Sequence, residues 1–246
     1  MATSNRDRVH DEAAWLLHST PYRETSLVVE LFTCEHGRMA AVARGAKRPH
    51  SSLRAVLLQF QPLKVSWTGR RELRTLTGAE WSGGLDAPRG AALLCAFYLN
   101  ELLLRLLARE DPHPALFVAY GQALEQLASP APVDETLRRF EWTLLRETGY
   151  APDLERDAAG HRIEDGCDYL WRAGEGFVLR TGDATVPADD GAGAVAGHVL
   201  RELAHGRITT AAGRLQAKYL TRRILSQVLD GAPLSTRQIL LDLHKL

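Results

Sequence analysis

Apolar and polar residues alternate along the first third of the chain. Residues 25–33, TSLVVELFT, place Leu27, Val29 and Leu31 on one side of an extended strand. The same alternation recurs at 13–19 (AAWLLHS), 38–43 (RMAAVA), 56–67 (VLLQFQPLKVSW) and 71–81 (RELRTLTGAEW). The alternation in 56–67 changes phase at Pro62, which predicts a bulge or bend inside a long strand. Five short strands with no helix between them predict a small antiparallel barrel.

Beyond residue 82 the apolar residues recur every three or four positions, the spacing of helices. The helix that begins at Leu93 is apolar around most of its circumference, which predicts that it is buried. Further helices are predicted at 115–128, 134–148 and 209–230, and Ser235 with Gln238 predicts a capping box that opens a last one. Residues 150 to 185, rich in Gly and Asp, indicate an irregular insert with a hairpin at YLWRAGEGFVL. We therefore expect a barrel domain over 1–82 and a helical domain over 83–246.

Charge is unevenly distributed, although the formal net charge is +0. Residues 1–82 contain 12 Lys and Arg against 8 Asp and Glu, whereas residues 83–246 contain 18 against 22. The window from His36 to Arg71 has no acidic residue and eight basic ones: Arg38, Arg44, Lys47, Arg48, Arg54, Lys64, Arg70 and Arg71. Both signs are usually interspersed on a protein surface, so this window predicts a positive field that attracts polyanions.

The densest part of that window is residues 43–55, ARGAKRPHSSLRA, between the third and fourth predicted strands. A run of charge is most often a solvated loop, and that interpretation stays open. The alternative is a nucleic-acid contact, because loops at the mouth of a small barrel clasp single strands. Gly45 and Pro49 would let the loop bend around a phosphate backbone.

Several classes of protein are disfavoured by the sequence. No apolar run approaches the length of a membrane span, and we expect no secretory signal in the polar first residues. Cys34, Cys95 and Cys167 are far apart and odd in number, which disfavours a disulfide framework and a clustered metal site and is typical of a reducing cytoplasm. No phosphate-binding glycine loop is present. A group of polar residues occurs at His161, Glu164, Asp165, Cys167 and Asp168. The sequence shows no pairing of a nucleophile with a base among them, and this disfavours a nuclease or NTPase. We expect no catalysis, cofactor or bound metal.

Five motifs, spread from about residue 13 to residue 243, together resemble the RecO family of DNA repair proteins. They are PYRETSLVVELFTCEHGRMAAVARGAKR, LQFQPLKV, FYLNELLLRLL, LRRFEWTLLRETGY and APLSTRQILLDL, in this order. The resemblance implies an α+β chain, with an N-terminal five-stranded OB-fold barrel followed by a C-terminal α-helical domain carrying a small finger-like insert. It also implies binding of single- and double-stranded DNA, and annealing of complementary strands coated with single-strand-binding protein (SSB). With RecR, the family loads RecA in the RecF pathway of recombinational repair. A cytoplasmic protein, on the nucleoid when bound to DNA, is expected. An OB-fold RNA-binding or translation-associated module is the alternative.

The resemblance makes DNA contact the favoured interpretation of the basic window. The residues expected to touch phosphates are Arg38, Arg44, Lys47, Arg48, Arg54, Arg70, Arg71 and Arg74. Contacts of this kind are independent of base sequence, as annealing requires.

The resemblance also implies a receptor for the C-terminal tail of SSB, which is acidic and ends in an apolar residue. Arg138, Trp142 and Arg146 are four residues apart and predict a stripe on one helix face. A cation–π ladder facing solvent is one interpretation. Tail binding is the other, with Leu102 and Leu106 supplying apolar surface and Arg138 and Arg139 the cations.

One departure from the family concerns zinc. Many members of the family carry two Cys-x-x-Cys-like pairs after the GY motif, whereas here the segment reads ERDAAGHRIEDGC and keeps only Cys167. A structural zinc site needs about four N or S ligands. We therefore expect a finger without metal, held by packing around Leu170, Trp171 and Phe177.

Overall fold

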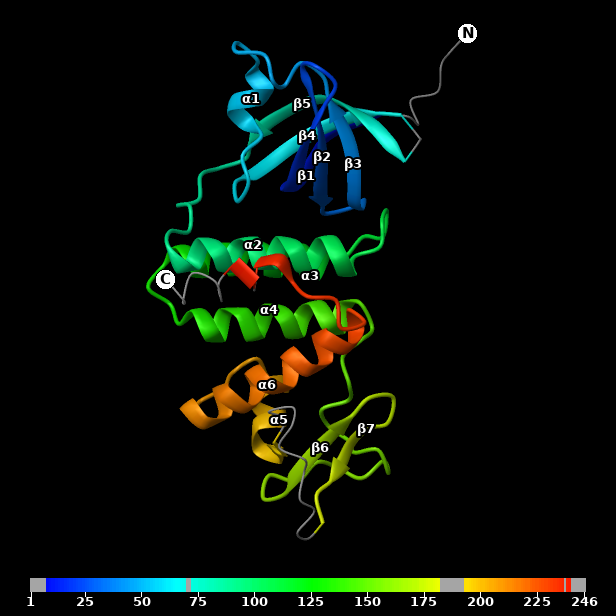
Figure 1. Ribbon diagram of the computed structural model, residues 1–246, viewed down its shortest axis with the longest axis vertical. Helices are drawn as coiled ribbons and strands as arrows, with labels where there is room; N and C mark the ends of the chain where they lie inside the picture. The colour runs from blue at the N-terminus through cyan, green and yellow to red at the C-terminus, as the bar shows by residue number, and fades with distance from the viewer. Residues whose placement is uncertain (1–7, 70–71, 182–192, 237, 240–246) are drawn as a thin grey trace. The chain divides into compact units, whose positions relative to one another are not determined.

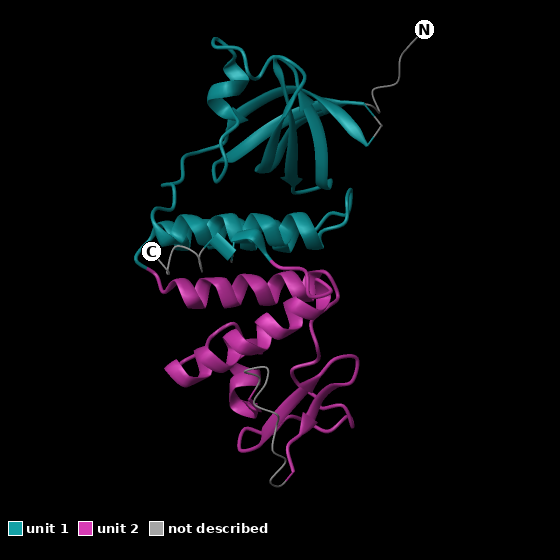
Figure 2. Cartoon of the chain, in the orientation of Figure 1, with its two compact units in different colours: residues 1–130, 234–246 teal, residues 131–233 magenta. Residues whose placement is uncertain are grey.

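The computed structural model describes residues 8–69, 72–181, 193–236 and 238–239. The chain forms two compact units, one of residues 1–130 with 234–246 and one of residues 131–233 (Figure 2). The first contains a β-barrel and a helical hairpin, and the second contains helices and a small sheet, so the predicted α+β class is confirmed. Within the described ranges, no helix is both long and apolar enough to cross a membrane.

The barrel is closed by five strands in the order β1-β2-β3-β5-β4 (Figure 1). The strands are β1 (Arg8–Tyr22), β2 (Ser26–Thr33), β3 (Gly37–Ala43), β4 (Pro62–Thr68) and β5 (Leu73–Trp81). β1 is long enough to pair with β4 along its first half and with β2 along its second, with a register shift in each pairing. Pairing is antiparallel except between β3 and β5, and a short helix, α1 (Ser52–Val56), connects β3 to β4. The five-stranded OB-fold implied by the family resemblance is confirmed, whereas the antiparallel barrel predicted from the alternation is wrong at the parallel β3–β5 pair.

Alternation along the strands places one set of apolar residues inside the barrel. Val29 and Leu31 of β2 face inward with Trp67 of β4, and all three are almost completely buried. Phe32 points to the other side of β2, yet it is equally buried, because its ring packs 5.5 Å from that of Phe117 in the helical hairpin. Both faces of β2 are therefore covered, which explains its nearly continuous apolar sequence.

The predicted long strand over 56–67 is wrong in its first half. The helix α1 ends at Val56, and Pro62 is the first residue of β4. Phe60 lies between them with a φ of 65° and a buried ring, which packs 5.0 Å from Phe97 of the hairpin. The change of phase at Pro62 therefore marks the start of a strand, and the alternation before it comes from a loop held down by Phe60.

The helical hairpin consists of α2 (Ala91–Leu106) and α3 (Pro114–Ala128), and it packs on the barrel. Trp15 of β1 lies edge-on to Tyr120 of α3 at 5.4 Å. Within this apolar contact, the buried Asn100 Nδ2 donates to the Leu17 carbonyl at 2.9 Å, and its Oδ1 accepts from the Tyr120 hydroxyl at 2.5 Å. Complete burial raises the pKa of Tyr120, so the phenol remains a donor. One amide thus satisfies a strand carbonyl and a helix hydroxyl together.

The turn between β2 and β3 approaches the loop after α2 so closely that only glycine fits. Gly37 has a φ of 67°, and a Cβ there would lie 2.2 Å from the Asp111 carbonyl oxygen. The neighbouring Glu110 N–H donates to the Arg38 carbonyl at 2.9 Å. The start of β3 is therefore fixed against the hairpin.

Residues after Pro233 return to the first unit, where they meet α2. The N–H groups of Ser235 and Thr236 donate to the Glu101 carboxylate at 2.8 and 2.9 Å. Burial raises the pKa of Glu101, but these bonds and the Thr236 hydroxyl outweigh it, and the pKa is lowered. The capping box predicted for Ser235 and Gln238 is wrong, because the Gln238 N–H donates to the Leu234 carbonyl and Glu101 receives the first N–H groups.

The second unit contains α4 (Val133–Glu147), α5 (Gly197–Ala204) and α6 (Ala211–Val228), together with a sheet in the order β7-β6-β8. The strands are β6 (Asp168–Arg172), β7 (Gly176–Leu179) and β8 (Val195–Ala196). The hairpin predicted in the insert is confirmed as β6–β7. The sequence analysis found neither β8 nor α5, because a two-residue strand and an eight-residue helix leave little periodicity to detect.

We expect Asn100→Ala to lower the free energy of unfolding by about 1–3 kcal/mol, because it removes two buried hydrogen bonds, one to the Leu17 carbonyl and one from the Tyr120 hydroxyl. The Leu17 carbonyl keeps the Gln59 side-chain amide as a second donor. Urea denaturation would measure this loss. Tyr120→Phe is the matched control and should cost about 1–2 kcal/mol, since it removes one donor only. A loss below about 0.5 kcal/mol for Asn100→Ala would show that the amide does not hold the hairpin to the barrel.

Candidate nucleic-acid interface

Four exposed cations lie in the connection between β3 and β4, which we call the basic segment (residues 44–54). They are Arg44, Lys47, Arg48 and Arg54. None of them forms an ion pair with a carboxylate in the described parts of the chain. Their charge is therefore not neutralised locally, and an external polyanion can compete for it without displacing a protein group.

The basic segment is held in place by its backbone and by one buried side chain. Ala46 is inserted into the barrel core, and the Lys47 N–H donates to the Thr25 carbonyl in the β1–β2 turn at 2.9 Å. Gly45 has a φ of 72°, the left-handed conformation that lets the chain turn before Ala46. In α1, Leu53 and Val56 pack against the same core. The cations are thus presented from a fixed platform at the end of β3.

The β1–β2 turn adds two residues that the sequence analysis missed. The Arg23 guanidinium lies over the Tyr22 ring, 5.1 Å from its centroid, and the hydrogen bond from Lys47 to Thr25 places this turn beside the basic segment. An arginine and an aromatic ring together suit a single strand, whose bases stack and whose phosphates need cations. Glu24, Glu30 and Glu35 all lie between this pair and the acid-free window that begins at His36, so the window did not include the pair.

Arg38 and Arg74, predicted to extend the basic track, are instead committed to ion pairs. Arg38 lies 3.8 Å from Glu30, and Arg74 lies 2.9 Å from Glu110. Burial lowers the pKa of Arg38, a shift that Glu30 opposes and Arg109 reinforces. Arg38 is the second residue of β3 and Arg44 follows its end, so about 20 Å of strand separates them. Arg70 and Arg71 lie outside the described residues.

The helix α4 is buried around more of its circumference than its sequence predicted. Leu137, Phe140 and Leu144 are buried, as expected. Arg138 and Trp142 are also buried, however, so the predicted surface stripe with Arg146 is not formed. Within the second unit α4 packs against α6, and a helix packed in this way needs apolar or paired groups on the covered face.

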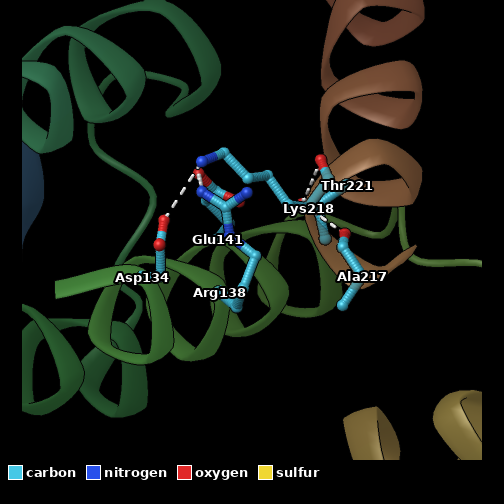
Figure 3. Close-up of polar contacts among 6 residues, drawn as sticks. All are labelled: Asp134, Arg138, Glu141, Ala217, Lys218 and Thr221. Atoms are coloured by element: carbon cyan, nitrogen blue, oxygen red, sulfur yellow. Dashed lines mark hydrogen bonds and ion pairs between the residues drawn. The ribbon is translucent and has the colours of Figure 1, made fainter. Parts of the chain in front are cut away.

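The buried Arg138 pairs with Glu141, about one turn further along α4. Its Nη2 lies 2.5 Å from Glu141 Oε1, and both side chains are almost fully buried (Figure 3). Lys218 of α6 reaches across to Asp134 at 3.3 Å (Figure 3). Arg138 is therefore part of the packing between α4 and α6, and it is not available at the lip of a surface pocket.

The other residues predicted to bind a tail are in different environments. The Arg139 side chain is exposed and pairs with Glu135 at 3.0 Å, an i,i+4 contact of the kind that water weakens. Leu102 is completely buried in α2 and Leu106 is half-buried. Arg139 belongs to the second compact unit and both leucines to the first.

The insert has a core of its own, and its residues do not fit a zinc ion. Phe177 and Tyr169 are buried with Leu154, Ile163 and Val195. Leu170 and Trp171, expected in this core, are only half-buried. The Tyr169 hydroxyl also accepts the Glu164 N–H at 2.9 Å, so packing and turns hold the hairpin.

The polar residues of the insert are occupied separately and do not converge. Cys167 lies 3.7 Å from Glu164, His161 lies 3.5 Å from Asp157, and Asp165 pairs with Arg201. Among the described residues, no three His, Cys, Asp or Glu side chains are grouped as metal ligands. In the described part of the insert, these residues offer the geometry of neither a zinc site like that of many family members nor an acid–base site.

Comparisons with known proteins agree with this architecture. Residues 8–85 match a family model described as "Recombination protein O N terminal", and residues 88–238 match one described as "Recombination protein O C terminal". The chain is 48% identical to a DNA repair protein RecO of Ralstonia nicotianae, across 97% of this chain and 86% of that protein. It is 46% identical to the protein of the same name from Aromatoleum aromaticum, across 99% of this chain and all of that protein. The protein of that name from Burkholderia pseudomallei is 49% identical, across 97% and 86%.

We expect the purified chain to hold no stoichiometric zinc, because its insert is built on a hydrophobic core. Elemental analysis should find well under one zinc per chain, and a chelator should leave the melting temperature unchanged. One tightly held zinc per chain, with a lower melting temperature after chelation, would show that the insert uses ligands not recognised in this geometry.

Proposed function

Because the chain belongs to the RecO family of DNA repair and recombination proteins, we propose that it binds DNA through the basic segment of its barrel and anneals complementary single strands. We also propose that it anneals strands coated with SSB and acts with RecR to load RecA. Its role in this proposal is to bind and align strands, without catalysis.

The observation that carries the DNA-binding proposal is the environment of Arg44, Lys47 and Arg48. These three side chains are exposed, held on one rigid turn and not neutralised by a described carboxylate. Each can replace the counterions of one phosphate, and the release of those counterions drives binding. Arg54 and Arg23 extend the same surface, and Tyr22 offers a ring for stacking.

Annealing favours such a surface over one that reads bases. Phosphate contacts fix a strand without regard to its sequence, whereas base-edge contacts discriminate. A strand held by its backbone leaves its bases free to pair with a complement.

An OB-fold module that binds RNA or serves translation is the rival, because the same cations and ring would bind any single strand. Annealing of complementary SSB-coated DNA would favour the proposal. Tight binding to RNA without annealing would favour the rival, and turnover of a nucleotide would contradict both.

We expect the triple substitution of Arg44, Lys47 and Arg48 by Ala to weaken DNA binding to a similar extent for unrelated sequences. The slope of log K against log salt should fall by up to about 0.7–0.9 for each lost contact. Fluorescence anisotropy with labelled single strands at several salt concentrations would measure both effects. The fold should survive, because the segment is held by Ala46 and by backbone hydrogen bonds.

The matched control replaces Arg146, Arg162 and Arg207 by Ala. All three arginines are exposed and lie in the second unit. Their substitution by Ala removes the same net charge as the substitution of Arg44, Lys47 and Arg48. In this control variant, the slope of log K against log salt should stay close to that of the parent. A folded basic-segment variant whose slope equals that of the parent would refute the proposed interface.

We propose further that Arg139 receives the acidic tail of SSB. Its guanidinium is exposed on α4, and among the described residues only the partly exposed Glu135 pairs with it, so a tail carboxylate can replace that partner. Arg138 is left out of this proposal, because its burial with Glu141 removes it from the surface. Leu102 is left out for the same reason, and Leu106 stays a prediction.

Reversing Arg139 to Glu should abolish binding of an SSB-tail peptide, because it turns an attraction into a repulsion. Binding and annealing of bare DNA should persist, while annealing of SSB-coated strands should fail. Arg146→Glu is the control, since it makes the same charge change on the same helix. Equal peptide affinity of parent and Arg139→Glu in calorimetry would place the tail elsewhere.

A further inference from the structure

The second unit contains a cavity of about 350 Å³ that the proposed DNA and tail sites do not use. It opens among the segment after α4, the turn of the β6–β7 hairpin and the last turns of α6. Trp171 and Tyr150 supply aromatic surface, and Ile224 and Val228 supply apolar surface. This size and composition are typical of a site that holds a side chain or a small ligand.

Carboxylates dominate the polar lining of this cavity. Asp153, Asp157 and Glu175 line it, against a single cation, Arg156. The Asp157 side chain is 9% exposed, and its Oδ1 accepts the N–H groups of Ala159 and His161, which fix its position. Unit 2 as a whole contains 13 Lys and Arg against 16 Asp and Glu. The local field therefore favours a cation and repels phosphate.

The neighbouring cavity shows how Trp171 receives a cation. This smaller space, about 60 Å³, shares Trp171 and is lined also by Tyr219 and Arg223. The Arg223 guanidinium lies 5.6 Å from the centroid of the Trp171 ring, whereas Arg223 does not line the larger cavity. The indole thus lines both an occupied arginine site and the larger cavity.

We propose that the larger cavity binds an arginine side chain presented by a partner protein. A guanidinium is planar, stacks on an aromatic ring and offers paired N–H donors to a carboxylate. The lining of this cavity provides both aromatic rings and carboxylates. The aliphatic stem of the arginine would contact Ile224 and Val228. Lysine would gain the charge but not the stacking, and a nucleic-acid strand would bring its phosphates to three carboxylates. The inference does not depend on the DNA-binding role.

A capped Gly-Arg-Gly peptide is the probe, and capped Gly-citrulline-Gly is its matched control, because citrulline keeps the shape and loses the charge. The full chain has five tryptophans, so the indole N–H signal of Trp171 can be assigned in ¹H–¹⁵N spectra with Trp171→Phe. The arginine peptide should move this signal saturably at a concentration below about 20 mM. The citrulline peptide should bind at least about tenfold more weakly.

Glu175→Gln should weaken binding of the arginine peptide by about three- to tenfold, since it removes one carboxylate from the lining of the cavity. The fold should tolerate this substitution, because Glu175 is exposed and, within the described residues, its carboxylate pairs only with Arg172, at 3.4 Å. Glu155→Gln is the control, since Glu155 is exposed in the same segment but outside the cavity. Equal binding of the citrulline peptide, or no saturable shift of the Trp171 signal, would overturn the proposal. A shift produced by oligo-dT in place of the arginine peptide would do the same and would assign the cavity to DNA.

Discussion

The first compact unit depends on one buried amide. Asn100 lies in the apolar contact between the barrel and the α2–α3 hairpin, and it bonds to a carbonyl of β1 and a hydroxyl of α3 at once. A polar group at this depth is tolerated only when its bonds are made. The amide therefore permits one fit between barrel and hairpin, which the rings of Trp15 and Phe32 then fill. This fit covers one part of the barrel with helices and leaves the basic segment exposed.

Ion pairing then sorts the basic residues into two groups. Arg74 pairs with Glu110 and joins the barrel to the loop after α2, whereas Arg38 pairs with Glu30 on the neighbouring strand of the barrel. Those beyond the end of β3 face no described carboxylate. In the second unit, Arg138 is likewise buried in an ion pair with Glu141. The charge that matters for binding is therefore the charge left over after packing, and a count of basic residues overestimates it.

The barrel could be predicted from sequence because its strands alternate and its order follows a known topology. The strand predicted before Pro62 was wrong because Phe60 packs against α2, a tertiary contact that local alternation does not report. The exposed cations of the basic segment could be named from the acid-free run. The pairing of Arg74 could not, because Glu110 is distant from it in sequence. The burial of Arg138 could not either, because a helical repeat does not show which faces a neighbouring helix covers. The Tyr22 and Arg23 pair was missed because Glu24, Glu30 and Glu35 separate it from the acid-free window.

Hydrogen–deuterium exchange of the full chain, with and without a single-stranded oligo-dT, tests the central claim most directly. The account predicts that bound DNA slows exchange in the basic segment and in the β1–β2 turn, where the backbone lies next to the proposed phosphates. Exchange around Arg38 and in the loop after α2 should be unchanged, since those arginines are already paired. Protection confined to Arg38 and that loop, with none in the basic segment, would contradict the account.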